Sequence, residues 1–190
     1  VMKFIEGETL KARLKRSPID REEINLVVES VGAALCYAHE KGILHRDVKP
    51  SNVLIAKDGR IYLADFGLAR MAEAGESTIS SDMMLGTPQY ISPEQAQGRR
   101  DLDAGTDIYS FGILIYELMV GKVPYTADTP YSIIHDHIFS PLPLPRSIKP
   151  EILPSVERVI LKALAKDRLD RFKDISSLVD AWEKANQEDG

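Results

Sequence analysis

The segment from residue 107 to residue 120 limits the possible folds more than any other part of the sequence. Apolar side chains occupy nearly every face of it, including Ile108, Phe111 and Leu114. A helix that is apolar all round must be enclosed by other elements rather than lie on a surface. The segment carries Glu117 and is shorter than the roughly 20 apolar residues of a membrane span. We therefore expect a buried helix and a mainly α-helical fold packed around it.

The composition of the 190-residue chain is that of a globular domain with a sizeable core. Apolar residues make up 44% and charged residues 28%, which is ordinary for such proteins. The net charge of −5 argues against a surface for nucleic acid or for a membrane. Cys36 is the only cysteine, so a reducing compartment is expected. With neither a membrane span nor a signal peptide in the sequence, we expect a cytoplasmic protein or the cytosolic domain of a larger, membrane-anchored one.

Local signals divide the chain into short elements. Asp20 is a typical N-cap of a long helix, and Gly42 ends that helix. The Asp58-Gly59 pair is typical of a tight hairpin turn. The other predicted elements are a strand end at 1–5, a turn at Glu6-Gly7, helices at 9–15, 128–139, 155–166 and 174–187, hairpin strands at 53–55 and 61–64, a polar loop at 71–85 and a proline-rich packed connector at 140–154.

The hairpin brings together side chains that suit phosphate chemistry. Asn52 precedes its first strand and Asp65 follows its second, so the two meet at one edge. An amide oxygen and a carboxylate are ligands that Mg²⁺ accepts. Asp47 lies just upstream, and Lys49 adds a positive charge of the kind that stabilises a transferring phosphoryl group. The residues outline a phosphoryl-transfer site.

Several motifs then resemble those of eukaryotic-like serine/threonine protein kinases, most closely the bacterial ones. The run from His45 to Asn52 resembles the catalytic loop, and Asp65-Phe66-Gly67 resembles the magnesium-binding motif. Ser92-Pro93-Glu94 is similar to the end of the activation segment, with Ser92 where the family usually has alanine. Asp107 resembles the start of the family's central helix, and Arg171 the late arginine that pairs with Glu94.

The resemblance implies a reaction and roles for individual residues. ATP and Mg²⁺ would be the cofactors, and Ser or Thr hydroxyls of proteins the acceptors. Asp47 would be the catalytic base, Lys49 would contact the γ-phosphate, and Asn52 and Asp65 would hold magnesium. Thr87, together with Lys49, favours serine or threonine over tyrosine as the acceptor.

The resemblance also implies where nucleotide and regulatory phosphate would bind. The expected nucleotide contacts are Met2 as gatekeeper, the hinge residues Lys3, Ile5 and Thr9, and an adenine floor of Leu10 and Leu54. The expected regulatory residues are Arg46 and Arg70 with the acceptors Thr78, Ser80 and Ser81, although residues 77–81 could equally be a plain solvated loop. A phosphate between two guanidinium groups could order such a loop.

The histidines look structural from the sequence. We expect His45 to be a buried, backbone-bonded side chain, and His39, His135 and His137 to be ordinary. His135 and His137 are two apart in a predicted helix and cannot share a ligand face.

The chain begins at Val1 inside a strand-like run, so we expect it to be cut from something longer. By resemblance, residues 1–8 are a hinge, 9–187 a kinase C-lobe with catalytic loop 45–52 and activation segment 65–94, and 188–190 a tail. No glycine-rich loop, strand lysine or helix glutamate for ATP occurs in the sequence, so the N-lobe would be a missing partner and the fragment alone nearly inactive. The alternatives are a pseudokinase-like or partner-docking module and, less favoured, a small-molecule phosphotransferase.

Overall fold

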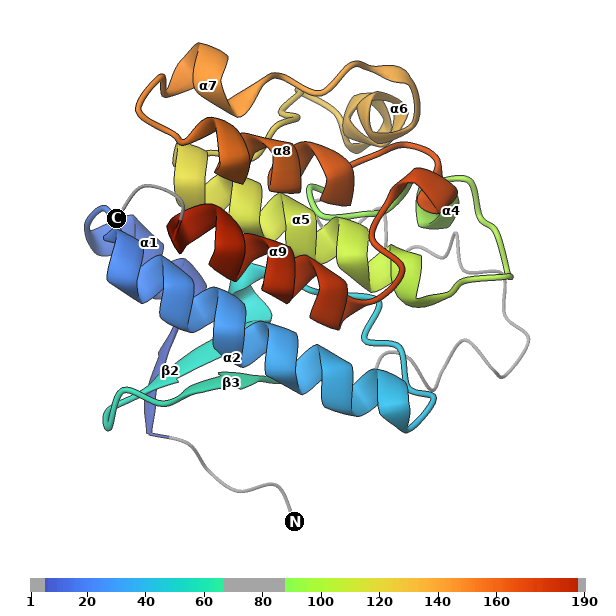
Figure 1. The fold of residues 1–190 in the computed structure, drawn as a ribbon. Coiled ribbons are helices and arrows are strands. Elements are labelled where there is room, and N and C mark those ends of the chain that lie inside the picture. The colour runs from blue at the N-terminus through green and yellow to red at the C-terminus, as the bar shows by residue number, and fades with distance from the viewer. Residues whose placement is uncertain (1–5, 67–87, 188–190) are drawn as a thin grey trace.

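The apolar segment predicted as a core helix forms α5 (Ala104–Val120), and the other elements surround it. The computed structural model describes residues 6–66 and 88–187. Figure 1 shows α5 running through the middle of the molecule, with the C-terminal helices α8 and α9 running alongside it. The other elements are β1 (Gly7–Thr9), α1 (Leu10–Arg16), α2 (Arg21–Glu40), η1 (Pro50–Asn52), β2 (Val53–Ala56), β3 (Ile61–Leu63), α4 (Pro93–Ala96), α6 (Pro130–Phe139), α7 (Pro145–Ile148), α8 (Pro154–Ala163), η3 (Arg168–Asp170) and α9 (Ile175–Gln187).

The burial of α5 confirms the mainly helical fold. Contacts from α2, α7, α8 and α9 leave most of its side chains without exposed surface, among them Phe111 and Leu114. Polar residues near its N-terminus, including Asp107, are buried as well. Because a buried carboxylate needs hydrogen-bond donors, we expect polar partners around Asp107 at this end of α5.

The long helix α2 begins and ends where the local signals predict. Asp20 caps it by accepting a hydrogen bond from the Glu23 backbone N–H. Lys41 is the C-cap, and Gly42 follows with a φ of 71°, a left-handed conformation that glycine adopts without strain. The buried face of α2 includes Val27, Val31 and Leu35, and it packs against α5, α9 and β3.

The sheet has one strand more than the predicted hairpin. Its order is β1-β2-β3, all antiparallel, with Thr9 opposite Leu54 and Leu54 opposite Tyr62. The predicted turn at Glu6-Gly7 is therefore wrong, because Gly7 is the first residue of β1. A Cβ at Gly7 would lie 2.1 Å from the Ile55 carbonyl oxygen, so only glycine allows the two strands to approach this closely.

In the C-terminal half the helices are confirmed, and several boundaries are corrected. Thr129 rather than Asp128 precedes α6, and it caps the helix through the Ser132 backbone N–H. The proline-rich connector 140–154 contains a short helix, α7, which the sequence did not predict. The short α4, η1 and η3 were not predicted, because each is a single turn, too short to show a helical pattern in the sequence. No helix within the described ranges is long and apolar enough to cross a membrane, and the predicted loop 71–85 lies outside those ranges.

Candidate active site

The loop between α2 and η1 is held by one buried carboxylate on α5. Asp107 Oδ2 accepts a hydrogen bond from the His45 backbone N–H at 2.8 Å, and its Oδ1 accepts one from the Arg46 backbone N–H at 2.7 Å. His39 Nε2, near the end of α2, lies 2.7 Å from Asp107 Oδ2. A carboxylate with three charge-assisted contacts is strongly fixed. The most buried helix of the protein therefore sets the position of the loop.

His45 is buried and joins the loop to Ala64, the residue directly after β3. Its Nε2 lies 2.8 Å from the Ala64 carbonyl oxygen, and its Nδ1 accepts a hydrogen bond from the Asp47 backbone N–H at 3.2 Å. Together the two bonds fix the tautomer, because Nδ1 must accept and Nε2 must donate. Its ring also contacts Phe66 edge to face, with centroids 4.6 Å apart. This agrees with the prediction of a backbone-bonded core histidine.

Asp47 lies at the centre of a small group of polar side chains. Asn52 Nδ2 donates to the Asp47 backbone oxygen at 2.7 Å and to its Oδ2 at 3.0 Å. Lys49 Nζ forms an ion pair with the same Oδ2 at 2.7 Å, and both side chains keep part of their surface exposed. The carboxylate of Asp47 is thus oriented from two sides while it stays accessible to a substrate.

The hairpin brings Asn52 and Asp65 to the same edge. The Ala64 backbone N–H donates to the Asn52 carbonyl oxygen at 2.8 Å, so Asp65 directly follows the residue paired with Asn52. Asp65 is exposed, whereas Asn52 is buried and uses its amide nitrogen for two hydrogen bonds to Asp47. Within the described residues, no donor reaches Asn52 Oδ1. The amide oxygen therefore has capacity for another partner.

This donor set fits Mg²⁺ better than a cation that requires a full protein cage. In the described part of the chain, no three His, Cys, Asp or Glu side chains gather as metal ligands. Mg²⁺ is usually held by one or two protein oxygens, with phosphate oxygens and water completing its shell. Asp65 and Asn52 supply two such oxygens.

Two residues of the site have a strained backbone. Arg46 has a φ of 65° and Asp65 a φ of 63°, and within the described ranges they are the only residues other than glycine with positive φ. This left-handed conformation is unfavourable for side chains with a Cβ. Strain of this kind concentrates at functional sites, and both residues belong to the motifs singled out in the sequence.

A buried ion pair ties α4 to the end of the chain. Arg171 Nη1 and Nη2 donate to Glu94 Oε1 and Oε2 at 2.8 and 2.9 Å. Thr106 Oγ1 also donates to Glu94 Oε1, at 3.0 Å. Burial by itself would raise the pKa of Glu94, but the hydrogen bonds and charge of Arg171 outweigh it and lower that pKa. The Glu94–Arg171 contact implied by the resemblance is present.

The helix α4 is also joined to the loop at 45–52. Ser92 and Gln95 form a capping box, in which each side chain bonds to the other residue's backbone. Gln95 Nε2 in addition donates to the Arg46 carbonyl oxygen at 2.9 Å. The serine in place of the usual alanine is therefore used as a helix cap, and Glu94 remains in place beside it.

Tyr90 is fixed against the opposite end of α5. Its hydroxyl donates to Glu117 Oε2 at 2.5 Å, and its carbonyl oxygen accepts from Ser110 Oγ at 2.7 Å. Burial raises the pKa of Glu117, although the hydrogen bond from Tyr90 opposes this. The segment that leads into α4 is thus held at two points along α5.

His137 is not an ordinary histidine. It is fully buried between Tyr109 and Tyr125, and its Nδ1 lies 3.0 Å from the Tyr109 hydroxyl. Burial, with a smaller effect from the nearby Lys166 ammonium, lowers the pKa of His137 to about 3. Lys166 Nζ donates to the His137 carbonyl oxygen and, by burial, has its own pKa lowered to about 8. The group fixes α6 to the loop after α8.

The comparisons with known proteins agree with this geometry. Residues 1–182 match the family model described as protein kinase domain. The chain belongs to the protein kinase family.

Similar kinases come from bacteria. A probable serine/threonine-protein kinase of Clostridium acetobutylicum is 39% identical over 184 residues, which cover 95% of this chain and 27% of that protein. The serine/threonine-protein kinase PknB of Mycolicibacterium smegmatis is 36% identical over 176 residues, 91% of this chain and 28% of its own. PknB of Mycobacterium tuberculosis is 38% identical over 176 residues, with the same two shares. The chain spans little more than a quarter of the length of these relatives.

One expected nucleotide contact of the kinase is corrected. Leu10 has no exposed surface and belongs to the hydrophobic core, so the expectation that it forms part of the adenine floor is wrong. It is the first residue of α1, a helix that packs against η1 and β2. Thr9 and Leu54 are opposite each other in β1 and β2, and the Thr9 hydroxyl caps α1 by accepting from the Ala12 N–H.

The remaining predicted site residues of the kinase lie outside the described residues. These are Met2, Lys3, Ile5, Gly67, Arg70, Thr78, Ser80, Ser81 and Thr87. The roles predicted for them stay predictions.

Sequence reasoning missed two residues that hold the kinase site. Gln95 stands three residues after Ser92, and this spacing is itself the signal for a capping box. His39, expected to be ordinary, bonds the buried Asp107. Its contact spans 68 positions in the chain, and no local pattern reveals such a pairing.

Proposed function

We propose that the chain is the C-terminal lobe of a serine/threonine protein kinase that transfers the γ-phosphoryl group of ATP to Ser or Thr hydroxyls of proteins. The observation that carries this is the Asp47 carboxylate, which Asn52 and Lys49 orient on a loop anchored by Asp107. Its partial exposure leaves it available to a substrate hydroxyl. The family membership supports the same chemistry.

In this proposal each side chain has a separate task. Asp47 accepts a hydrogen bond from the substrate hydroxyl and takes its proton as the oxygen–phosphorus bond forms and the bond to the departing ADP oxygen breaks. Lys49 lies beside that carboxylate, where its charge can stabilise the transferred phosphoryl oxygens. Asp65 and Asn52 would hold Mg²⁺, which when bound neutralises charge on the phosphates.

The acceptor and the setting are part of the proposal. The Lys49-Pro50-Ser51-Asn52 run and the names of the similar bacterial kinases support serine or threonine as the acceptor. The 190 residues contain no glycine-rich loop or strand lysine for the ATP phosphates, so we expect this chain by itself to transfer little phosphate. The single Cys36 and the acidic net charge fit action in the cytoplasm.

The central test replaces Asp47 in the complete gene product that contains these 190 residues, called the parent protein below whatever its length. Asp47→Ala should lower kcat by about 10²–10⁴-fold, the usual contribution of a positioned acid–base group. Phosphate incorporation into a generic protein substrate measures it, and Asp128→Ala, at an exposed position in the loop before α6, is the matched control. Near-normal turnover by Asp47→Ala would rule out the proposed role.

The same assay separates the proposal from a partner-docking module. A parent protein that incorporates phosphate in an Asp47-dependent way is a kinase, whether or not the 190-residue chain alone is active. A parent protein without any incorporation, with intact folding by circular dichroism, would favour the docking module.

A further inference from the structure

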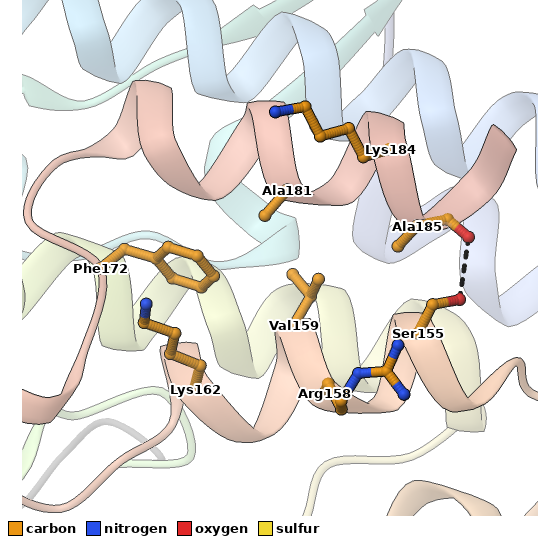
Figure 2. A pocket seen from close by; sticks show the side chains of 8 residues that line it. All are labelled: Ser155, Arg158, Val159, Lys162, Phe172, Ala181, Lys184 and Ala185. Atoms are coloured by element: carbon orange, nitrogen blue, oxygen red, sulfur yellow. Dashed lines mark hydrogen bonds between the residues drawn. The ribbon is translucent and has the colours of Figure 1, made fainter. Parts of the chain in front are cut away.

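A shallow groove between α8 and α9 lies apart from the residues of the candidate active site. It encloses about 320 Å³, at the lower end of the volumes typical of binding pockets. Figure 2 shows side chains from both helices around it, with Phe172 at one end and Ser155 at the other. None of the residues assigned above to phosphoryl transfer lines it.

The floor of the groove is apolar and made of small or flat side chains. It consists of Val159, Ala181, Ala185 and the Phe172 ring. Ser155 is also buried, and its hydroxyl is used internally, since Oγ donates to the Ala185 carbonyl oxygen at 3.0 Å (Figure 2). The two alanines leave room over α9 for one inserted apolar side chain, and the floor offers it no hydrogen-bonding group.

The rim of the groove is cationic. Lys162 and Lys184 are exposed at its edges, and Arg158 lies one turn before Lys162 on α8. Lys162 Nζ lies 4.7 Å from the centre of the Phe172 ring, so it is held beside the apolar floor. Among the residues that the structure describes, none that lines the groove is acidic, in a chain whose net charge is −5. The charge of the groove is therefore opposite to that of the protein as a whole.

We propose that this groove docks an acidic peptide segment of a partner protein, with one apolar side chain inserted over Ala181 and Ala185 and carboxylates beside the lysines. The apolar floor would supply affinity and the cationic rim would select acidic sequences. The proposal concerns binding and does not depend on phosphoryl transfer.

A peptide fits this surface better than an anionic membrane does. Membrane-binding surfaces insert protruding apolar side chains, whereas the apolar residues here form a recess. The large exposed apolar side chains of the described residues, such as Tyr131, Phe139 and Leu169, lie elsewhere. Because the lysines are exposed, we expect binding to weaken as salt is added.

The test uses the 190-residue chain and four fluorescein-labelled dodecapeptides. Each peptide carries one leucine, isoleucine, methionine or phenylalanine among glutamates and aspartates, and fluorescence anisotropy measures binding. At least one peptide should bind with a Kd below about 1 mM. The double variant Lys162→Glu with Lys184→Glu should weaken that binding tenfold or more. Ala181→Glu, which fills the groove and adds a negative charge, should do the same.

The matched control changes the net charge equally at exposed lysines outside the groove. Lys15→Glu with Lys122→Glu should leave the affinity within about twofold, since distant surface charges are screened. Analogue peptides with glutamine and asparagine in place of the acids, or alanine in place of the apolar residue, should each bind at least tenfold more weakly.

Four results would overturn the proposal. They are failure of all four peptides to bind, equal losses in the groove and control variants, undiminished binding of the neutral analogue, and binding to phosphatidylserine vesicles without binding to any peptide. Circular dichroism of each variant establishes that a loss of binding is not a loss of folding.

Discussion

Two carboxylates, Asp107 and Glu94, are buried, and different hydrogen-bond donors stabilise each of them. Asp107 is stabilised by two backbone N–H groups and a histidine, and Glu94 by a two-pronged contact with a guanidinium. An unpaired buried charge is very costly, so each carboxylate determines where its donors must be. Asp107 thereby positions a loop, and Glu94 positions α4 against Arg171.

The Glu94–Arg171 pair should make stability depend on pH in the acidic range. The pKa of Glu94 is lower in the folded protein than its ordinary value of 4.5. Its stabilising effect is therefore fully present above about pH 4.5 and lost as the pH falls through the lowered pKa. Glu94→Gln should cost about 3 kcal/mol at pH 7, because it leaves Arg171 buried without a countercharge.

Urea unfolding of wild type and Glu94→Gln between pH 7 and pH 3 tests this. The difference in unfolding free energy should shrink as the pH falls below 4.5, and Glu151→Gln, at an exposed position, should show no such trend. A constant difference across the range would contradict the predicted pKa direction.

Asp65 should matter for nucleotide binding rather than for folding, because its side chain is exposed. We expect Asp65→Ala to abolish magnesium-dependent binding of ATP to the parent protein, since it removes one of two proposed protein ligands. Titration calorimetry with and without Mg²⁺ measures this, with the exposed Asp180→Ala as the control. Unchanged affinity in the presence of Mg²⁺ would refute the assignment.

Among the elements, the close contact between α5 and α8 depends on Gly112, a residue without a side chain. A Cβ on Gly112 would lie 2.9 Å from Ala163 Cβ and 3.0 Å from Leu164 Cδ2. The two helices can therefore approach closely only where α5 has no Cβ.

Gly112→Ala should destabilise the protein by about 2 kcal/mol, the usual cost of overpacking a core. Adding Ala163→Gly frees space on the facing helix, so the double variant should be more stable than the sum of the two single changes predicts. Denaturant unfolding of all four proteins gives the coupling. If the changes in unfolding free energy of the two single variants simply add in the double variant, the two positions do not interact.

The elements that the sequence predicts best are those defined by local signals. The N-cap Asp20 directly precedes α2 and Gly42 closely follows it, and the β2–β3 hairpin carries its own turn residues. β1 was missed because its partner, β2, lies more than forty residues away and its glycine mimics a turn. Leu10 was misplaced for a related reason, since only the tertiary packing of α1 decides that it is buried.

The contacts of the candidate site likewise fall into local ones, which the sequence predicts, and long-range ones, which it does not. Asp47, Lys49 and Asn52 lie close in the sequence, so their motif predicts their proximity. The supporting contacts of His39 and Gln95 join segments 68 and 49 positions apart, and a single sequence does not encode such contacts in any local pattern.

For the molecule as a whole, α5 contacts α2, α7, α8 and α9, so we expect these helices to unfold together. The single tryptophan, Trp182 on α9, is buried, and its Nε1 donates to Asn25 Oδ1 on α2 at 3.0 Å. We expect its fluorescence and the far-ultraviolet helix signal to change at the same urea concentration. An earlier fluorescence transition would show instead that α9 separates from α2 before the rest unfolds.

The left-handed backbone at Arg46 and Asp65 has a consequence for laboratory evolution. Glycine adopts such φ values without penalty, whereas other residues lose about 1 kcal/mol or more. A library selected only for thermal tolerance or expression should therefore enrich glycine at both positions, and the survivors would lack the Asp65 carboxylate. At both positions, selection for robustness should favour glycine, whereas selection for phosphate transfer should retain the present residue.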